Sequence, residues 1–393
     1  MNKILSLILV VTTMLTSFYF FHVNKKPVNS FIGQSNLKQT LIQDCTPQKN
    51  PRQCWEQAIK SAINTQGLGA AFDLIAQLYA TQPVFASECH SYTHELGQAA
   101  YFLFKKDQKI NLGDKTSYCG FGFYHGFMET LINNGGQIQE ARDFCSYAGR
   151  VVKGQGTDAE GSCYHGIGHG AVDGSDPRTW GNAEALIASA LDMCKKVALT
   201  DTFLLRCTSG IFNSLAIMYS TSQYKLVVDK SNPFGICAEQ SSRPIKSACY
   251  GEMNTFILHY NNEDLKKVAD FLKLVREKEY LSLTIEGVAT YIASYALKNG
   301  ISNDKVIEFC RWLDSASQPS CMQGFGGGLI EFGSPTLGYV SAINFCSTKK
   351  LTEAEANACF TKVLWLAGVY YPKERQAEIC AKVEEKYKQH CVL

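Results

Sequence analysis

The chain has 393 residues, of which 46% are apolar, and its formal net charge is +2. An apolar content close to half supports a large buried core, which excludes an intrinsically disordered protein. The near-neutral balance excludes the basic surface with which proteins bind the phosphates of nucleic acids.

An apolar segment opens the chain. Residues 4–21 read ILSLILVVTTMLTSFYFF, with lysines on both sides. The segment is just long enough to span a bilayer as a helix, and its bulky aromatic end does not form a small-residue cleavage site. We therefore expect a membrane signal over residues 1–24, followed by a linker over residues 25–40. The missing cleavage site favours an uncleaved anchor over a cleaved signal peptide.

The cysteines indicate the compartment of the remaining residues. There are 16, an even number in a chain with an export signal, and no two are spaced as C-x-x-C. Such a set is typical of disulfides, which form in oxidising compartments. The sequence predicts a single-pass protein of the cell envelope with its body outside the cytoplasm, or a secreted protein if the signal is cleaved.

The cysteines fall into eight consecutive couples. An apolar helical run typically ends near the first cysteine, a polar turn follows, and the second cysteine opens another apolar run, which predicts a helical hairpin around each couple. Pairing within each couple is an inference from the repeat, because connectivity cannot be deduced from sequence. The couples are Cys45/Cys54, Cys89/Cys119, Cys145/Cys163, Cys194/Cys207, Cys237/Cys249, Cys310/Cys321, Cys346/Cys359 and Cys380/Cys391.

Two further features indicate a repeat. A glycine often stands three residues after the second cysteine, which predicts close contact between neighbouring helices; examples are Gly122, Gly166, Gly210 and Gly324. Between Cys237 and Cys310 the spacing of first cysteines doubles, and a unit without cysteines fits there, with Leu272 and Thr284 at the cysteine positions and Gly287 retained.

These patterns predict an all-α fold: an array of about nine disulfide-linked helical hairpins, either an α-solenoid or an α/α toroid. The array forms a single ectodomain over residues 41–393. It resembles the secreted, cysteine-rich Sel1-like repeat proteins, and TPR-like arrays, in architecture only. The cysteine spacings here vary more widely and the C-x-x-G-x-x-H pattern is not part of the Sel1-like signature, so the resemblance implies no function.

Histidines and carboxylates recur in the early units. Residues four apart share one face of a helix, which predicts three polar sets. His125 and His169 both stand six residues after a cysteine, and Glu129 and Asp173 both stand ten after it, so homologous units should bring the sets together. The sets are His90 with His94, His125 with Glu129, and His165 with His169 and Asp173.

Imidazole and carboxylate groups together are the usual ligands of zinc and non-haem iron, and an oxidising compartment also permits copper. We expect a core ligand set of His94, His125 and His169, with His165 and His90 as further candidates. Glu129 or Asp173 would be an additional ligand or would orient an imidazole. Glu95 is a candidate general base. The alternative is that these side chains only satisfy one another inside buried helices.

The later units lack the histidine. At its position they carry Asn213, Thr255, Thr290, Gly327 and Trp365, although Glu331 retains the carboxylate ten residues after its cysteine. The hairpin fold therefore does not require the histidine. We expect histidine-bearing repeats over residues 41–180 and structural repeats over residues 181–393.

Three functions remain open. The sequence favours a metal-binding scaffold anchored to the membrane. A metal-dependent hydrolase or oxidoreductase would use the same residues together with an open coordination position. A metal-free scaffold would bind a protein or a glycan on its concave face, as helical repeats often do. The sequence does not decide whether the protein is an enzyme.

Overall fold

The computed structural model describes residue 45 and residues 50–107, 109–152 and 158–391. By its internal contacts the chain divides into Met1–Pro47 and Gln48–Leu393. The described residues form α-helices, short 3-10 helices and turns, with no strand among them. The expected signal segment and linker, over residues 1–24 and 25–40, lie outside this part. Within it, no helix combines the length and hydropathy needed to cross a bilayer.

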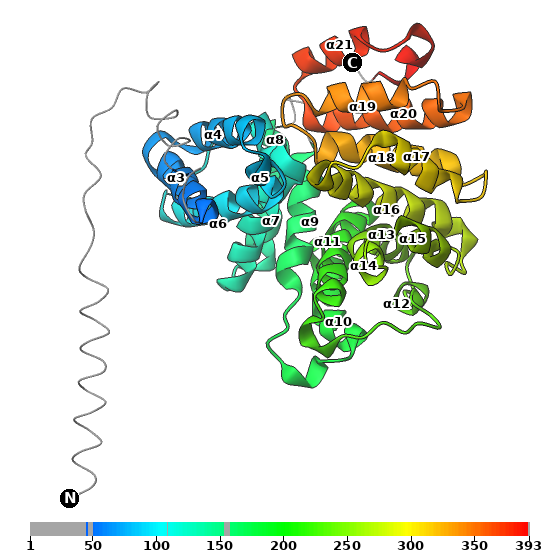
Figure 1. Cartoon of the computed structure of the whole chain (residues 1–393). Coiled ribbons are helices and arrows are strands. Elements are labelled where there is room, and N and C mark those ends of the chain that lie inside the picture. The colour runs from blue at the N-terminus through cyan, green and yellow to red at the C-terminus, as the bar shows by residue number, and fades with distance from the viewer. Residues whose placement is uncertain (1–44, 46–49, 108, 153–157, 392–393) are drawn as a thin grey trace, which may run out of the picture. The chain divides into compact units, whose positions relative to one another are not determined.

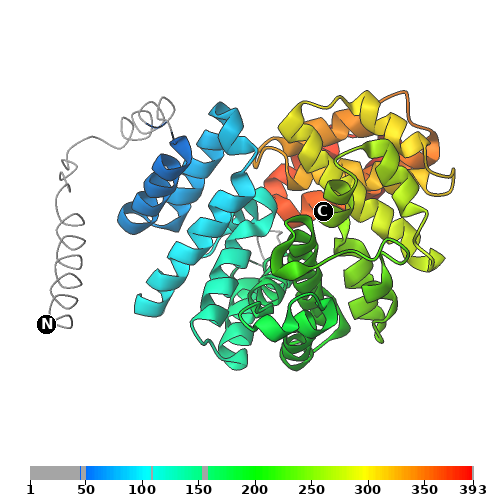
Figure 2. The same cartoon turned by 60° about the horizontal axis from the view of Figure 1, so that its bottom comes forward.

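An inner row of helices runs through residues 89–370, each helix packing against the next in chain order (Figures 1 and 2). The short helix α14 (Asn254–Tyr260) follows α13 and packs on both α11 and α16. The inner helices are α6 (Cys89–Asp107), α7 (Tyr118–Asn133), α9 (Ala159–Ala171), α11 (Asp201–Ser220), α13 (Arg243–Glu252), α16 (Lys278–Asn299), α18 (Gln318–Glu331) and α20 (Glu353–Tyr370).

Outer helices precede the inner ones. From α8 onward each outer helix packs on the inner helix that follows it, up to the α19–α20 pair, which confirms the predicted repeat of hairpins. The helices outside the inner row are α3 (Pro51–Gln66), α4 (Leu68–Thr81), α5 (Pro83–Ala86), α8 (Ile138–Val152), α10 (Ala183–Val197), α12 (Gly235–Ala238), α15 (Leu265–Leu272), α17 (Asn303–Arg311), α19 (Gly338–Cys346) and α21 (Lys373–Ala381), and the 3-10 helices are η1 (Asp114–Ser117), η3 (Pro177–Thr179), η4 (Gln223–Lys225) and η5 (Glu385–His390).

The disulfides follow the predicted couples. Seven couples, from Cys89/Cys119 to Cys380/Cys391, are bonded within themselves. Cys45 and Cys54 are also disulfide-bonded. The unit without cysteines is the α15–α16 hairpin, where the side chains of Leu272 and Thr284 are buried instead.

The Cys89–Cys119 disulfide differs from the predicted hairpin pattern. Cys89 begins α6 instead of ending an outer helix, and Cys119 lies at the start of α7, so this bond joins two neighbouring inner helices. Only the short helix η1 stands between α6 and α7. The expectation of a hairpin across this couple was therefore wrong, because no outer helix separates the two inner ones.

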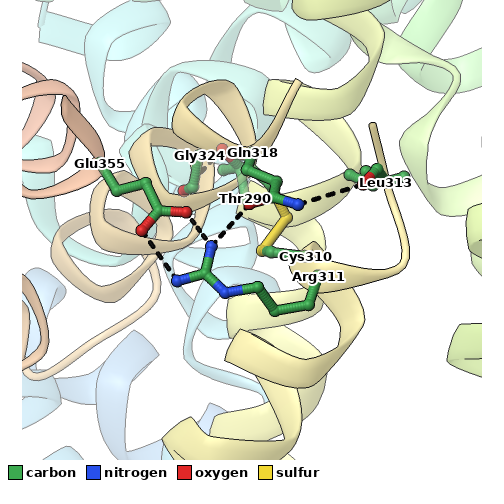
Figure 3. The surroundings of a disulfide bond; sticks show 8 residues. Thr290, Cys310, Arg311, Leu313, Gln318, Gly324 and Glu355 are labelled. Carbon is green, nitrogen blue, oxygen red and sulfur yellow. Dashed lines mark hydrogen bonds and ion pairs between the residues drawn. A yellow bond between two sulfur atoms is a disulfide. The ribbon is translucent and has the colours of Figure 1, made fainter. Parts of the chain in front are cut away.

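An ion pair connects the hairpin around Cys310–Cys321 to the next hairpin (Figure 3). Arg311, at the end of α17, donates to Gln318 at 2.8 Å and forms an ion pair with Glu355 of α20. Glu355 is 2% exposed and also completes a capping box with Thr352 at the start of α20. This buried carboxylate therefore stabilises both the helix start and the contact between hairpins.

The predicted glycine contacts are confirmed. A Cβ placed on Gly166 would lie 2.4 Å from the carbonyl oxygen of Tyr124, and one on Gly210 would lie 2.0 Å from that of His165. In the unit without cysteines, a Cβ on Gly287 would lie 2.2 Å from the carbonyl oxygen of Gly251. The inner helices thus approach backbone to backbone, which no side chain at these glycines would permit.

The two ends of the inner row meet. The hydroxyl of Tyr79 donates to the carbonyl of Phe332 at 3.0 Å, and the hydroxyl of Ser117 donates to the carbonyl of Tyr370 at 3.0 Å. The rings of Phe121 and Tyr370 lie 4.8 Å apart. Within Gln48–Leu393 the row therefore returns on itself, and its helices line a cavity of about 1280 Å³.

Candidate metal centre

Three histidines from two neighbouring inner helices form a compact cluster. His125 comes from α7, and His165 and His169 come from successive turns of α9. Their nitrogen ligand atoms all lie within 4.8 Å of one another. Close approach of the two helices, which Gly166 and Gly170 permit, places the imidazoles side by side. This cluster, called the histidine triad below, has a geometry that could hold one metal ion.

The His169 ring is oriented by neighbours that hold its Nδ1 atom. Ser214 Oγ lies 2.9 Å from Nδ1, and Glu129 Oε1 lies 3.7 Å from it. The opposite nitrogen, Nε2, is buried and makes no hydrogen bond of regular geometry with the described residues, although the Asn213 side chain lies close enough to act on the ring. A buried imidazole nitrogen without a partner is costly unless something fills the place beside it, and a metal ion would do so.

Glu129 connects the triad to His94. The Nε2 atom of His94 lies 3.1 Å from Glu129 Oε2, so the carboxylate lies between His94 and His169. Burial acts to raise the pKa of Glu129, but the hydrogen bond from His94 and the neighbouring histidines outweigh it, so the pKa is lowered. His94, which we expected to be a ligand, is thus placed as a partner of Glu129, outside the triad.

His90 lies beside the triad and is held by the backbone of α7. Its ring centre is 4.9 Å from that of His125, and its Nδ1 atom lies 2.8 Å from the carbonyl oxygen of Cys119. Cys119, Gly120 and Phe121 all have positive φ angles, which is uncommon for the two of them that are not glycine. This left-handed turn, which the Cys89–Cys119 disulfide joins to α6, brings the carbonyl to His90.

Burial keeps the imidazoles neutral. Desolvation lowers the pKa of His90 and of His169 to about 4, and it lowers the pKa of His125 and of His165 well below the usual value. The neighbouring histidines lower these pKa values further, whereas Glu129 opposes the shift at His169. Neutral imidazole is the form that binds a metal. At neutral pH the four rings are therefore in the protonation state that metal binding requires.

Two expected site residues lie elsewhere. Helix α9 ends at Ala171, so Asp173 does not continue the face of His165 and His169; it is exposed and accepts hydrogen bonds from Ser175. Glu95 forms an ion pair with Lys60 of α3 at 3.1 Å. Adjacent residues on a helix point in directions about 100° apart, which explains why His94 and Glu95 meet different partners.

Two rings of the triad, those of His125 and His165, line the cavity, and the other lining residues come from both halves of the chain. His90, His125 and His165 contribute to the wall, as do groups that the sequence analysis did not single out as site residues. Asn213 donates to Glu252 at 3.0 Å, and burial raises the pKa of Glu252 to about 7. The position in the repeat could have identified some of these cavity residues. Asn213, Thr255 and Thr290 occupy the repeat position of His125 and His169, and all three line the cavity.

Comparison of the chain with models of protein families, with curated proteins and with solved structures finds no match.

Proposed function

We propose that this chain is a metal-binding protein whose histidine triad, His125, His165 and His169, holds one transition-metal ion at the wall of the cavity. The observation that carries the proposal is the buried Nε2 of His169, which forms no regular hydrogen bond with the described residues, while Ser214 and Glu129 lie at the other nitrogen of the ring. Metal-ligating histidines characteristically have their second nitrogen held in this way.

The donor set favours zinc. No carboxylate or cysteine of the described residues joins the three imidazoles within the same ligand distance. Non-haem iron centres with open positions typically combine two histidines with a carboxylate, and blue-copper centres require a cysteine. Three histidines and a water molecule form a zinc site of the type found in carbonic anhydrase.

The compartment also belongs to the proposal. The many disulfides suggest an oxidising environment, outside the cytoplasm or after secretion. We propose that residues 1–24 anchor the chain in a membrane and that the body faces the extracytoplasmic side. Metal supply and folding would both take place there.

The test is the metal content of the full chain, produced in an oxidising compartment and purified in mild detergent without chelator. We expect about one zinc per chain, the stoichiometry of a single tetrahedral site. His125→Ala and His169→Ala should lose the metal. His259→Ala is the matched control, because His259 is partly exposed and pairs only with Glu263 at 2.8 Å. Wild-type protein that folds without stoichiometric metal, even after zinc is added, would support a metal-free protein- or glycan-binding scaffold instead.

The cavity favours a second candidate, a metal-dependent enzyme. Three imidazoles leave a fourth position of a tetrahedral ion, and the triad lies at the wall of a space larger than most small-molecule sites. A zinc-bound water in that position has its pKa lowered toward 7 and becomes a nucleophile for hydrolysis. Hydrolysis of an activated ester by the zinc-loaded chain, lost in His125→Ala and retained in His259→Ala, would support this candidate over a purely metal-binding scaffold.

A further inference from the structure

Glu331, the last residue of α18, is a carboxylate of the cavity wall without a partner of its own. It makes no hydrogen bond or ion pair with another residue in the described part of the chain. Burial raises its pKa, and Lys362 and Arg206 only partly oppose the shift. Both cations are already paired: Lys362 contacts Glu286 at 2.7 Å, and Arg206 pairs with Asp158.

Two aromatic side chains line the same cavity as this carboxylate. Phe121 and Tyr370 line the cavity with ring centres 4.8 Å apart. Phe121 directly follows Gly120, which adjoins Glu331, and the charge of Glu331 acts on the Tyr370 hydroxyl. A carboxylate without a partner and aromatic rings in one cavity are the groups that recognise an ammonium group, through an ion pair and cation–π attraction.

The same residues place this subsite next to the metal centre. A Cβ on Gly120 would lie 3.6 Å from Glu331 Cγ and 3.3 Å from His90 Nδ1, so Glu331 and His90 flank one glycine. The His90 ring in turn lies 4.9 Å from the ring of His125. Glu331, His90 and His125 are therefore connected by consecutive contacts along the cavity wall.

We propose that the cavity binds an α-amino acyl ligand, with its ammonium group on Glu331 between Phe121 and Tyr370, and its carbonyl oxygen on the metal. In such a ligand the ammonium and the carbonyl are carried by adjacent carbon atoms, which suits two neighbouring subsites. The inference rests on the proposed metal site. The N-terminus of a peptide and a free amino acid share this chemistry.

The cavity favours a peptide as the source. Its volume of about 1280 Å³ far exceeds what one amino acid fills. Its lining also includes Ile217, Leu297 and Trp365, which are 41%, 43% and 45% exposed and offer apolar surface beyond the ammonium subsite. Further residues of a peptide would cover this surface.

The test compares two hydroxamates of the same carbon skeleton, leucine hydroxamate and 4-methylpentanohydroxamate, which lacks the amine. Both chelate a metal through the hydroxamate group, so calorimetry on the zinc-loaded full chain isolates the effect of the amine. We expect leucine hydroxamate to bind about tenfold more tightly or better, as a desolvated ion pair provides. Glu331→Gln should abolish the preference, and Glu263→Gln, which changes a partly exposed carboxylate that does not line the cavity, should retain it.

The outcomes separate the two proposals. Equal binding of both hydroxamates, or an undiminished preference in Glu331→Gln, would overturn the ammonium subsite while leaving the metal site intact. Absence of bound zinc would overturn the metal site itself. Competition with leucine hydroxamate then identifies the source: stronger competition by leucylglycylglycine than by free leucine supports a peptide, and the reverse order supports an amino acid.

Discussion

The carbonyl oxygen of His94 lies against Gly126, so close that a Cβ on the glycine would be 1.9 Å from it. Gly126→Ala must therefore push α6 away from α7, and we expect the free energy of unfolding to fall by about 1–3 kcal/mol, as in overpacked cores. Gly69→Ala is the matched control, because a Cβ there meets nothing within 4 Å. It should leave stability unchanged or raise it by up to about 1 kcal/mol. Chemical denaturation measures both, and equal effects would contradict the close helix contact.

Glu129 should control metal affinity without being a ligand. Its carboxylate lies 3.1 Å from His94 and 3.7 Å from His169, on the side of the ring away from Nε2. We expect Glu129→Gln to weaken zinc binding by about 10- to 100-fold, the usual effect of removing such a partner. Competition with a chromogenic chelator gives the affinity. Glu263→Gln, which changes the carboxylate paired with His259, should have no effect, and equal affinities in all three proteins would contradict the role of Glu129.

The metal-free protein should lose stability as the pH falls from about 6.5 toward 4. The pKa values of His90 and His169 are about 4 in the folded chain, and those of His125 and His165 are well below the usual 6.5. The unfolded chain therefore takes up protons first in this range, which costs the folded state up to about 1.4 kcal/mol per histidine for each pH unit. Denaturation after chelation measures the slope. His125→Gln should reduce it and His259→Gln should not.

The Arg311–Glu355 pair should have its own dependence on pH. Burial acts to raise the pKa of Glu355, but Arg311 and the Thr352 cap lower it overall. The stabilisation is thus fully present above the ordinary pKa of a glutamate and is lost as the pH falls through the lowered value. Glu355→Gln should destabilise the fold at pH 7 by about 1.5–3 kcal/mol, the range for a hydrogen bond to a charged group, because Arg311 is partly exposed. The difference from wild type should shrink below pH 4; a constant difference would contradict the ion pair.

The sequence by itself determined the helical hairpins and most of their disulfides. Cysteines, apolar runs and glycines recur in one register, and each hairpin is a local structure whose parts are close in the chain. For the same reason the unit without cysteines, around Leu272 and Thr284, could be recognised. The exception is the hairpin expected around Cys89 and Cys119: the two cysteines are bonded as predicted, but nothing in the local pattern shows that no outer helix separates α6 from α7.

Part of the metal centre could also be predicted from register. His125 and His169 stand at equivalent positions of neighbouring units, and the close contact of α7 with α9 brings them together. Register could not decide which of the other polar groups join them. Because α9 ends at Ala171, Asp173 does not lie on the face that carries His165 and His169. His94 contacts Glu129, which lies between His94 and His169, and is therefore not part of the triad.

The cavity was decided only by the tertiary structure. Glu331 lies more than two hundred residues from His90, and the two side chains flank Gly120 because the inner row returns on itself. That return is set by small rotations added over many helix contacts, to which no single motif in the sequence corresponds. The histidines could therefore be found from local spacing, whereas the grouping of Glu331 with Phe121 and Tyr370 in one cavity required the closed arrangement of the whole row.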